Sequence, residues 1–117
     1  MMIDTRAIGF GLTEAILRHV ESRVESALGF AAGHVVRVTV RLDDVNGEGR
    51  GGADKRCRIV AALRRHRTVT VEAVNADLYA AIDAAAAKAR LAALRDVRRS
   101  VSLERKGARR PGALIPA

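Results

Sequence analysis

The amino-acid sequence predicts one α+β domain with the element order β-α-β-β-β-α, a two-layer sandwich in which two helices cover one face of a four-stranded sheet. Two segments carry apolar residues at helical spacing, and three segments between them alternate apolar and polar residues. The chain has 117 residues, of which 49% are hydrophobic, and this is enough for one modest core. Aromatic residues make up only 3%, so the expected core is aliphatic. We expect this domain to span residues 1–99.

The first two expected elements are a short strand over residues 2–7 and an amphipathic helix that begins after Thr13. A threonine at this position accepts a hydrogen bond from the first helical turn. One face of the helix is apolar, with residues spaced by three or four: Ile16, Val20, Val24, Ala27 and Leu28. Gly29 is expected to end the helix.

Three strands follow, and their alternation assigns each side chain to one of two faces. We predict an antiparallel meander, connected by the turn-rich segment 43–54 and by the basic loop 64–67. Its inner face takes the small and branched apolar residues: Val36, Val38, Val40, Leu42, Cys57, Ile59, Ala61, Leu63, Val69, Val71 and Ala73.

A second helix is expected after Asn75, which can cap it, with Asp77 near its positive end. Its inner stripe is rich in alanine, which favours helix and permits close packing on a sheet: Leu78, Ile82, Ala85, Ala89 and Ala93. The apolar periodicity is lost near residue 100, and residues 97–117 carry six basic side chains and one acidic side chain. We therefore expect a flexible basic tail over residues 100–117.

The net charge and the absence of targeting and metal-binding patterns indicate which classes of protein this sequence fits. A formal net charge of +8 and a pI near 11.2 favour an anionic partner. No apolar run approaches the ~18 residues of a membrane span, and the N-terminus lacks the layout of a signal peptide. The single cysteine cannot form an internal disulfide, and no Cys/His cluster has zinc spacing. We expect a cytoplasmic protein without a metal or other cofactor.

Residues that could support catalysis are scattered along the chain. Residues 47–52 match G-x-G-x-x-G, but strand-like sequence follows where a nucleotide-binding fingerprint needs a helix. Cys57 has the inward parity of a small buried hydrophobe. The three histidines belong to different elements: His19, His34 and His66. His66 lies among arginines, where it could join phosphate contacts. No constellation indicates an enzyme or a small-molecule substrate.

Basic side chains are the strongest functional signal. Lys88, Arg95 and Arg99 fall within about 20° of one line on the second helix, roughly 110° from the alanine stripe. We call these three residues the helix ridge. The strands, the loop between the last two strands and the end of the second helix add further arginines: Arg37, Arg41, Arg56, Arg58, Arg64, Arg65, Arg67 and Arg98.

The simplest interpretation of such residues is a solvated surface that aids solubility. Alignment of arginines on separate elements favours nucleic acid instead, and the excess of arginine over lysine favours forked contacts with phosphates. A membrane-surface role would need an exposed apolar stripe on a helix, and the sequence has none.

Two segments resemble a known family. Residues 77–83 read D-L-Y-A-A-I-D and are followed by Lys88, like the second helix of the ribosome hibernation promoting factor / ribosome-associated inhibitor A / sigma-54 modulation family. Residues 11–16 (G-L-T-E-A-I) and 18–20 (R-H-V) resemble the first helix of that family. The resemblance covers residues 2–106. Leu91 stands where the family has a basic residue.

The resemblance implies a fold like that of a double-stranded-RNA-binding domain. It implies binding to the small ribosomal subunit, with contacts to rRNA and ribosomal proteins in the mRNA/tRNA channel, so that translation stops and inactive ribosomes are stored under stress, as in stationary phase. The basic positions of the second helix carry over to Lys88, Arg95 and Arg99. The chain resembles the short, single-domain form, and we expect a monomer when it is free. Two alternatives stay open: a general binder of structured RNA, and a protein-interaction module that regulates transcription.

Overall fold

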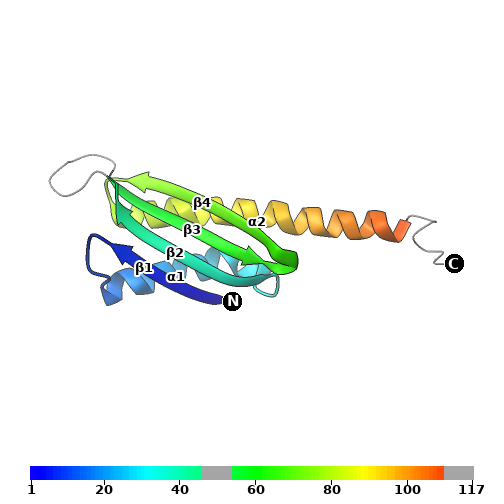
Figure 1. Cartoon of the computed structure of the whole chain (residues 1–117), viewed down its shortest axis with the longest axis horizontal. Helices are drawn as coiled ribbons and strands as arrows, with labels where there is room; N and C mark the ends of the chain where they lie inside the picture. The colour runs from blue at the N-terminus through cyan, green and yellow to red at the C-terminus, as the bar shows by residue number, and fades with distance from the viewer. Residues whose placement is uncertain (46–53, 110–117) are drawn as a thin grey trace.

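The computed structural model describes residues 1–45 and 54–109, with side chains described to residue 101. Four strands form one sheet, and both long helices lie against the same face of it, so the other face is uncovered (Figure 1). The elements are β1 (Met2–Ile8), α1 (Glu14–Leu28), β2 (Val35–Asp44), β3 (Lys55–Leu63), β4 (Arg67–Asn75) and α2 (Leu78–Arg109). Two short 3-10 helices, η1 (Gly29–Ala31) and η2 (Arg64–His66), complete the order. The predicted α+β order is confirmed.

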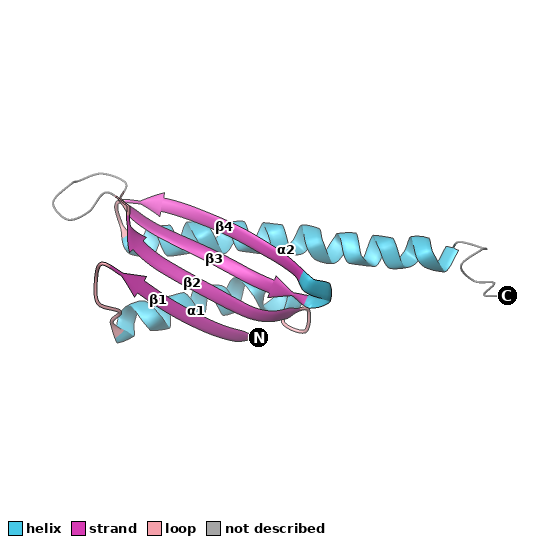
Figure 2. Cartoon of the chain, in the orientation of Figure 1, coloured by secondary structure: helices cyan, strands magenta, loops and turns pink. Residues whose placement is uncertain are grey.

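The strands lie in the order β1-β2-β3-β4 (Figure 2). Strand β1 is parallel to β2, because α1 carries the chain back across the sheet between them. Strands β2, β3 and β4 are antiparallel neighbours, as the predicted meander requires. Strands β1 and β4 are therefore the edges of a mixed sheet.

The core lies between the sheet and the two helices, and it is aliphatic as predicted. The predicted stripe of α1 is buried, and so is the predicted stripe of α2 from Ile82 onward, whereas Leu78 at its start is partly buried. Ala85, Ala89 and Ala93 are each at most 1% exposed. Because these side chains are small, the axis of α2 can approach β3 and β4 closely, and most of the larger core side chains come from the strands and from α1, with Ile82 contributed by α2.

One strand position and one helix cap differ from the sequence predictions. The register between β2 and β3 shifts between Val35 and Arg37, which buries Val35 and leaves Val36 58% exposed. Val36 therefore does not belong to the inner face. At the start of α2, Asp77 caps the helix by accepting a hydrogen bond from the Tyr79 backbone, and the Asn75 side chain accepts one from the backbone of Asp77.

The ends of both helices also differ in detail from expectation. Helix α1 ends before Gly29 as predicted, but Gly29 keeps a right-handed conformation and the chain continues into η1. Helix α2 runs past residue 100 to Arg109, where we expected the flexible tail to have begun. Its 32 residues extend well beyond the sheet (Figure 1). Residues 110–117 of the expected tail, and the whole glycine-rich segment 47–52, lie outside the described residues. No helix in the described part of the chain could cross a membrane.

Candidate nucleic-acid interface

The helix ridge lies along the open edge of the sheet. All three of its side chains are exposed on α2. The Nζ atom of Lys88 lies 2.9 Å from the backbone carbonyl oxygen of Glu72 and donates a hydrogen bond to it. This carbonyl belongs to the edge strand β4, where it has no further strand to pair with. Lys88 therefore supplies a hydrogen-bond donor to a backbone carbonyl at the edge of the sheet, and this contact holds the helix ridge next to β4.

The other two ridge residues lie at the opposite end of the same edge. Arg95 and Arg99 line a shallow hollow together with Thr68 and Val69 of β4. Arg98 is exposed one position away on α2. Leu91, at the position where the family resemblance implied a basic residue, is 55% exposed between Lys88 and Arg95. The ridge is thus a cationic edge with one apolar side chain in its middle.

The uncovered sheet face carries a row of charges that crosses all four strands. The strand register pairs Arg6 with Arg41, Arg41 with Arg58, and Arg58 with Glu72. Three guanidinium groups thus lie on adjacent strands before a carboxylate ends the row. Like charges directly opposite each other oppose pairing of the strands. The three adjacent guanidinium groups make this part of the uncovered face electropositive.

Arg41 and Arg58 make no ion pair with any residue in the described part of the chain, and Arg37 lies exposed nearer the other end of β2. Sequence reasoning missed Arg6, although the alternation of residues 2–7 would have assigned it to the same face. Arg6 lies 3.3 Å from Asp4 in a pair that is largely exposed, so its charge is only weakly compensated.

Arg56 was assigned to this outer face, but its charge is compensated. Its Nε and Nη2 atoms lie 2.9 and 2.5 Å from the two carboxylate oxygens of Asp43, its partner on β2. These hydrogen bonds raise the pKa of Arg56, and Asp43 is buried beneath the pair. A forked pair of this kind holds both side chains in one geometry. Arg56 therefore joins the ends of β2 and β3, and it is a poor candidate for RNA contact.

The β3–β4 turn presents arginines of two kinds. Arg64 and Arg65 are exposed in η2. Arg67 is half-buried, and its Nη1 atom lies 3.2 Å from Asp96 and 3.1 Å from the hydroxyl of Ser100, both on α2. The same Asp96 carboxylate accepts a hydrogen bond from His34 Nε2 at 3.0 Å. Arg67 thus anchors α2 to the sheet, whereas Arg64 and Arg65 extend the basic surface.

In the described part of the chain, His19 and Cys57 have structural surroundings and are not placed for catalysis or metal binding. His19 Nε2 lies 2.7 Å from Asp83, which also pairs with Arg23, and this cluster joins α1 to α2. Cys57 is fully buried, and burial raises the pKa of its thiol to about 12. A neutral buried thiol is neither a nucleophile nor a metal ligand. The described residues contain no group of three side chains that could hold a metal ion.

Comparisons with known proteins found a matching family and similar folds. A family model described as "Sigma 54 modulation protein / S30EA ribosomal protein" matches residues 3–99.

The chain belongs to this family.

Members of the sigma-54 modulation/S30EA family are ribosome-binding factors and not enzymes, so the function of this chain is ribosome-associated. Two solved structures are similar to it. The N-terminal domain of Protein Y from Thermus thermophilus is 28% identical, with a TM-score of 0.64 over 78% of this chain and 93% of that chain. A ribosomal subunit interface protein from Coxiella burnetii is 14% identical, with a TM-score of 0.67 over 78% and 91% of the two chains. A comparison with curated proteins found no match.

Proposed function

We propose that this protein binds the small ribosomal subunit through rRNA contacts in the mRNA/tRNA channel, and that it thereby blocks translation and stabilises inactive ribosomes under stress. The observation that carries the proposal is the gathering of exposed basic side chains along the β4 edge and on the uncovered sheet face, in a member of the sigma-54 modulation/S30EA family. The helix ridge follows the β4 edge, and the row of Arg6, Arg41 and Arg58 lies on the sheet face that this edge borders. A partner on the ribosome would confine the protein to the cytoplasm.

The chemistry of the basic surface suits an RNA partner better than a protein partner. Its cations are arginines and one lysine, and a guanidinium group forms two parallel hydrogen bonds with a phosphate. The described part of the surface is poor in exposed aromatic rings that could stack on bases, so recognition rests on phosphate spacing and on shape. Each phosphate that is neutralised releases condensed counterions, and this release supplies much of the binding free energy.

Inhibition by such a protein requires no bond to be made or broken. The sheet and α2 form a rigid body, because Arg67 and Lys88 tie the helix to β4 at two separate points. A rigid body lodged in the channel would occupy the space of mRNA and of tRNA in the A and P sites. Translation would then stop by exclusion alone, and the protein would leave the ribosome intact.

A competition experiment tests the proposal against a general RNA-binding role. Labelled protein is bound to purified small subunits and then challenged with bulk A-form duplex RNA or with mRNA and initiator tRNA. We expect mRNA and tRNA to displace the protein, and duplex RNA to do so only in large excess. If duplex RNA and small subunits bound equally well, the channel proposal would be wrong.

A second experiment concerns the cellular state in which the protein acts. Extracts from growing cells and from cells entering stationary phase are separated on sucrose gradients and probed for the protein. We expect it in the small-subunit and 70S fractions of the stationary cells, with a loss from those fractions as salt is raised. A protein that stays at the top of both gradients, bound to an acidic protein in high salt, would support transcriptional regulation instead.

A further inference from the structure

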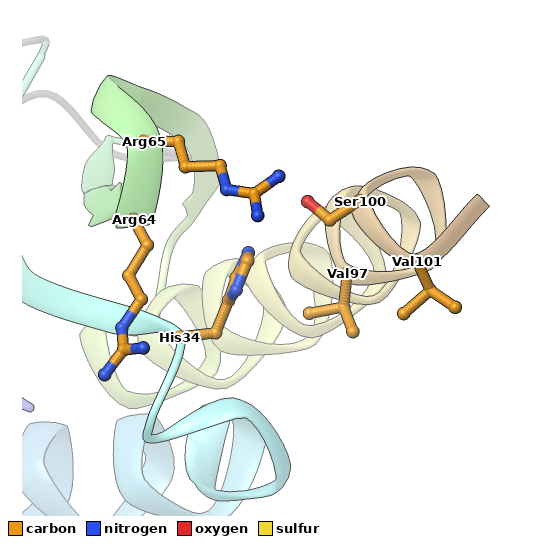
Figure 3. Close-up of a pocket in the computed structure, with 6 residues that line it drawn as sticks. All are labelled: His34, Arg64, Arg65, Val97, Ser100 and Val101. Atoms are coloured by element: carbon orange, nitrogen blue, oxygen red, sulfur yellow. The ribbon is translucent and has the colours of Figure 1, made fainter. Parts of the chain in front are cut away.

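Two polar side chains that line the pocket beside the β3–β4 turn are already hydrogen-bonded within the fold (Figure 3). His34 pairs with Asp96, and the hydroxyl of Ser100 accepts a hydrogen bond from Arg67. This pocket therefore belongs to the contact between α2 and the sheet. Groups that the fold leaves without partners lie at the opposite edge of the sheet, on β1.

The two edge strands of the sheet differ in how they are protected. At β4, Lys88 reaches the edge and donates a hydrogen bond to the backbone carbonyl of Glu72, and a lysine at such a place discourages pairing with a further strand. Strand β1 ends the sheet on the other side, and no strand of the described residues lies beyond it (Figure 2). The strand contains no proline, so its backbone N–H and C=O groups that point away from β2 can pair with another strand.

The side chains of β1 form a self-complementary pattern. On the uncovered face the order is Met2, Asp4, Arg6 and Ile8, so an acidic and a basic residue lie between two apolar residues. When the strand is turned end for end, the base takes the place of the acid. Two copies of β1 that paired antiparallel about Thr5 would therefore place Asp4 opposite Arg6 twice. Each end of the pairing would then bring two apolar side chains together.

Only this antiparallel register pairs opposite charges. A shift by one residue would place the uncovered face of one copy beside the helix-covered face of the other. A shift by two residues would place Asp4 opposite Asp4, or Arg6 opposite Arg6, and like charges directly opposite each other disfavour pairing. The register centred on Thr5 also uses the full length of the strand, Met2–Ile8.

The centre of this pairing holds a buried group that lacks a partner. The hydroxyl oxygen of Thr5 is the one buried side-chain polar atom in the described part of the chain without a hydrogen bond. Buried polar groups in folded proteins are nearly always paired. Threonines that face each other on antiparallel strands can form a hydroxyl–hydroxyl hydrogen bond. In the register above, Thr5 lies opposite Thr5 of the second copy, which would supply the missing partner.

We propose that β1 pairs antiparallel with β1 of a second copy of this chain and joins the two four-stranded sheets into one. The resulting dimer has two-fold symmetry, and the same surface serves both copies. Because β4 is the edge opposite β1, the helix ridges lie at the two far edges of the joined sheet. This dimer departs from the monomer that the sequence led us to expect. It forms without RNA, so it does not rest on the proposed ribosomal function.

Sedimentation of the full chain, purified free of RNA and run over a series of concentrations, tests the association. We expect a monomer–dimer equilibrium, and we expect the backbone amides of residues 2–8 to exchange hydrogen more slowly as the dimer fraction rises. A protein that stays monomeric to millimolar concentration would overturn the proposal. Slow exchange of these amides in a monomer, equal at all concentrations, would mean that another segment of the chain covers the edge, and it would overturn the proposal too.

Two charge-reversal variants give a matched test of the register. Asp4→Arg leaves two arginines on the uncovered face of β1, and Arg6→Asp leaves two aspartates there. Each variant alone opposes like charges, and we expect its dimer dissociation constant to rise by about tenfold or more. In an equimolar mixture the opposite charges meet again, so we expect a mixed dimer with an affinity near that of the unmodified protein. Undisturbed dimers of either variant alone, or a mixture that does not associate, would refute the register.

A third variant tests the hydroxyl at the centre of the pairing. Thr5→Val keeps the shape of the side chain and removes the unpaired buried hydroxyl, so the melting temperature of the dilute monomer should stay the same or rise. In the dimer the same change removes the hydroxyl pair, and the dissociation constant should rise by about two- to tenfold. An unchanged dissociation constant would contradict pairing about Thr5. Small-subunit binding by all three variants is measured separately, so failure of the dimer is not confused with failure of ribosome binding.

Discussion

Arg67 Nη1 lies 3.2 Å from one carboxylate oxygen of Asp96, and this pair joins the first residue of β4 to α2. The other oxygen of Asp96 accepts a hydrogen bond from His34 at 3.0 Å. Both partners of Arg67 on the helix, Asp96 and Ser100, are largely buried. One arginine of the basic turn therefore serves the fold, and its neighbours Arg64 and Arg65 remain at the surface.

The first prediction concerns the stability that this carboxylate supplies. Asp96→Asn keeps the size of the side chain and removes the charge that faces Arg67 and His34. We expect the free energy of unfolding to fall by about 1–2 kcal/mol, as for other hydrogen bonds to charged groups. Denaturation in urea measures the change. The control is Asp4→Asn, which breaks the exposed pair with Arg6 and should change stability by less than about 0.5 kcal/mol. Equal effects of the two substitutions would show that Asp96 has no special role.

The helix ridge is tested by its salt dependence. The triple change Lys88→Ala, Arg95→Ala and Arg99→Ala should weaken binding to small subunits, by about 1 kcal/mol or somewhat more for each residue. A plot of log affinity against log salt should also become shallower by about 2–3 units, because fewer counterions are released. Filter binding over a range of salt concentrations measures both quantities. The control is Arg18→Ala, an exposed α1 arginine paired with Glu14. A ridge variant with unchanged affinity and slope would remove the ridge from the interface.

The row on the sheet face predicts opposite effects on stability and on binding. Arg41 lies between Arg6 and Arg58, so Arg41→Thr relieves two like-charge contacts and should raise the free energy of unfolding by about 0.5 kcal/mol. Small-subunit affinity should fall at the same time, because one exposed cation is lost. Arg58 lies between Arg41 and Glu72, so Arg58→Thr should leave stability nearly unchanged. Thermal melts and binding assays of both variants check this contrast. Destabilisation by Arg41→Thr would mean that repulsion in the row is negligible.

The burial of Cys57 predicts slow alkylation of the folded protein and a contribution to stability that depends on pH. Its thiol is fully buried with a pKa raised to about 12, so alkylation near neutral pH should require unfolding and should accelerate strongly in denaturant. The unfolded thiol has a pKa near 9.0. Between these two values the unfolded state binds fewer protons than the folded state, so the contribution of Cys57 to stability falls as pH rises. Mass spectrometry of alkylated protein and urea denaturation above pH 9 measure the two effects. Rapid labelling of the native protein would contradict the burial.

Much of the fold could be read from periodicity. Burial of the α1 stripe and of Cys57, Ile59 and Ala61 on β3 follows the predicted spacing. The departure at Val36 comes from a register shift that depends on the neighbouring strand, and period-two counting cannot detect it. The continuation of α2 past residue 100 also escaped prediction, because a helix that has left the sheet no longer needs an apolar stripe.

The sequence by itself determined the order of the elements, the aliphatic core and the surplus of arginines, because these depend on composition and on local spacing. Only the tertiary structure decided which arginines are available to a partner. Arg56 meets Asp43 through strand register, and Arg67 meets Asp96 because α2 packs across the start of β4. Charges that are far apart along the chain compensate each other only when folding brings them within about 3 Å, and Coulomb energy depends on that distance.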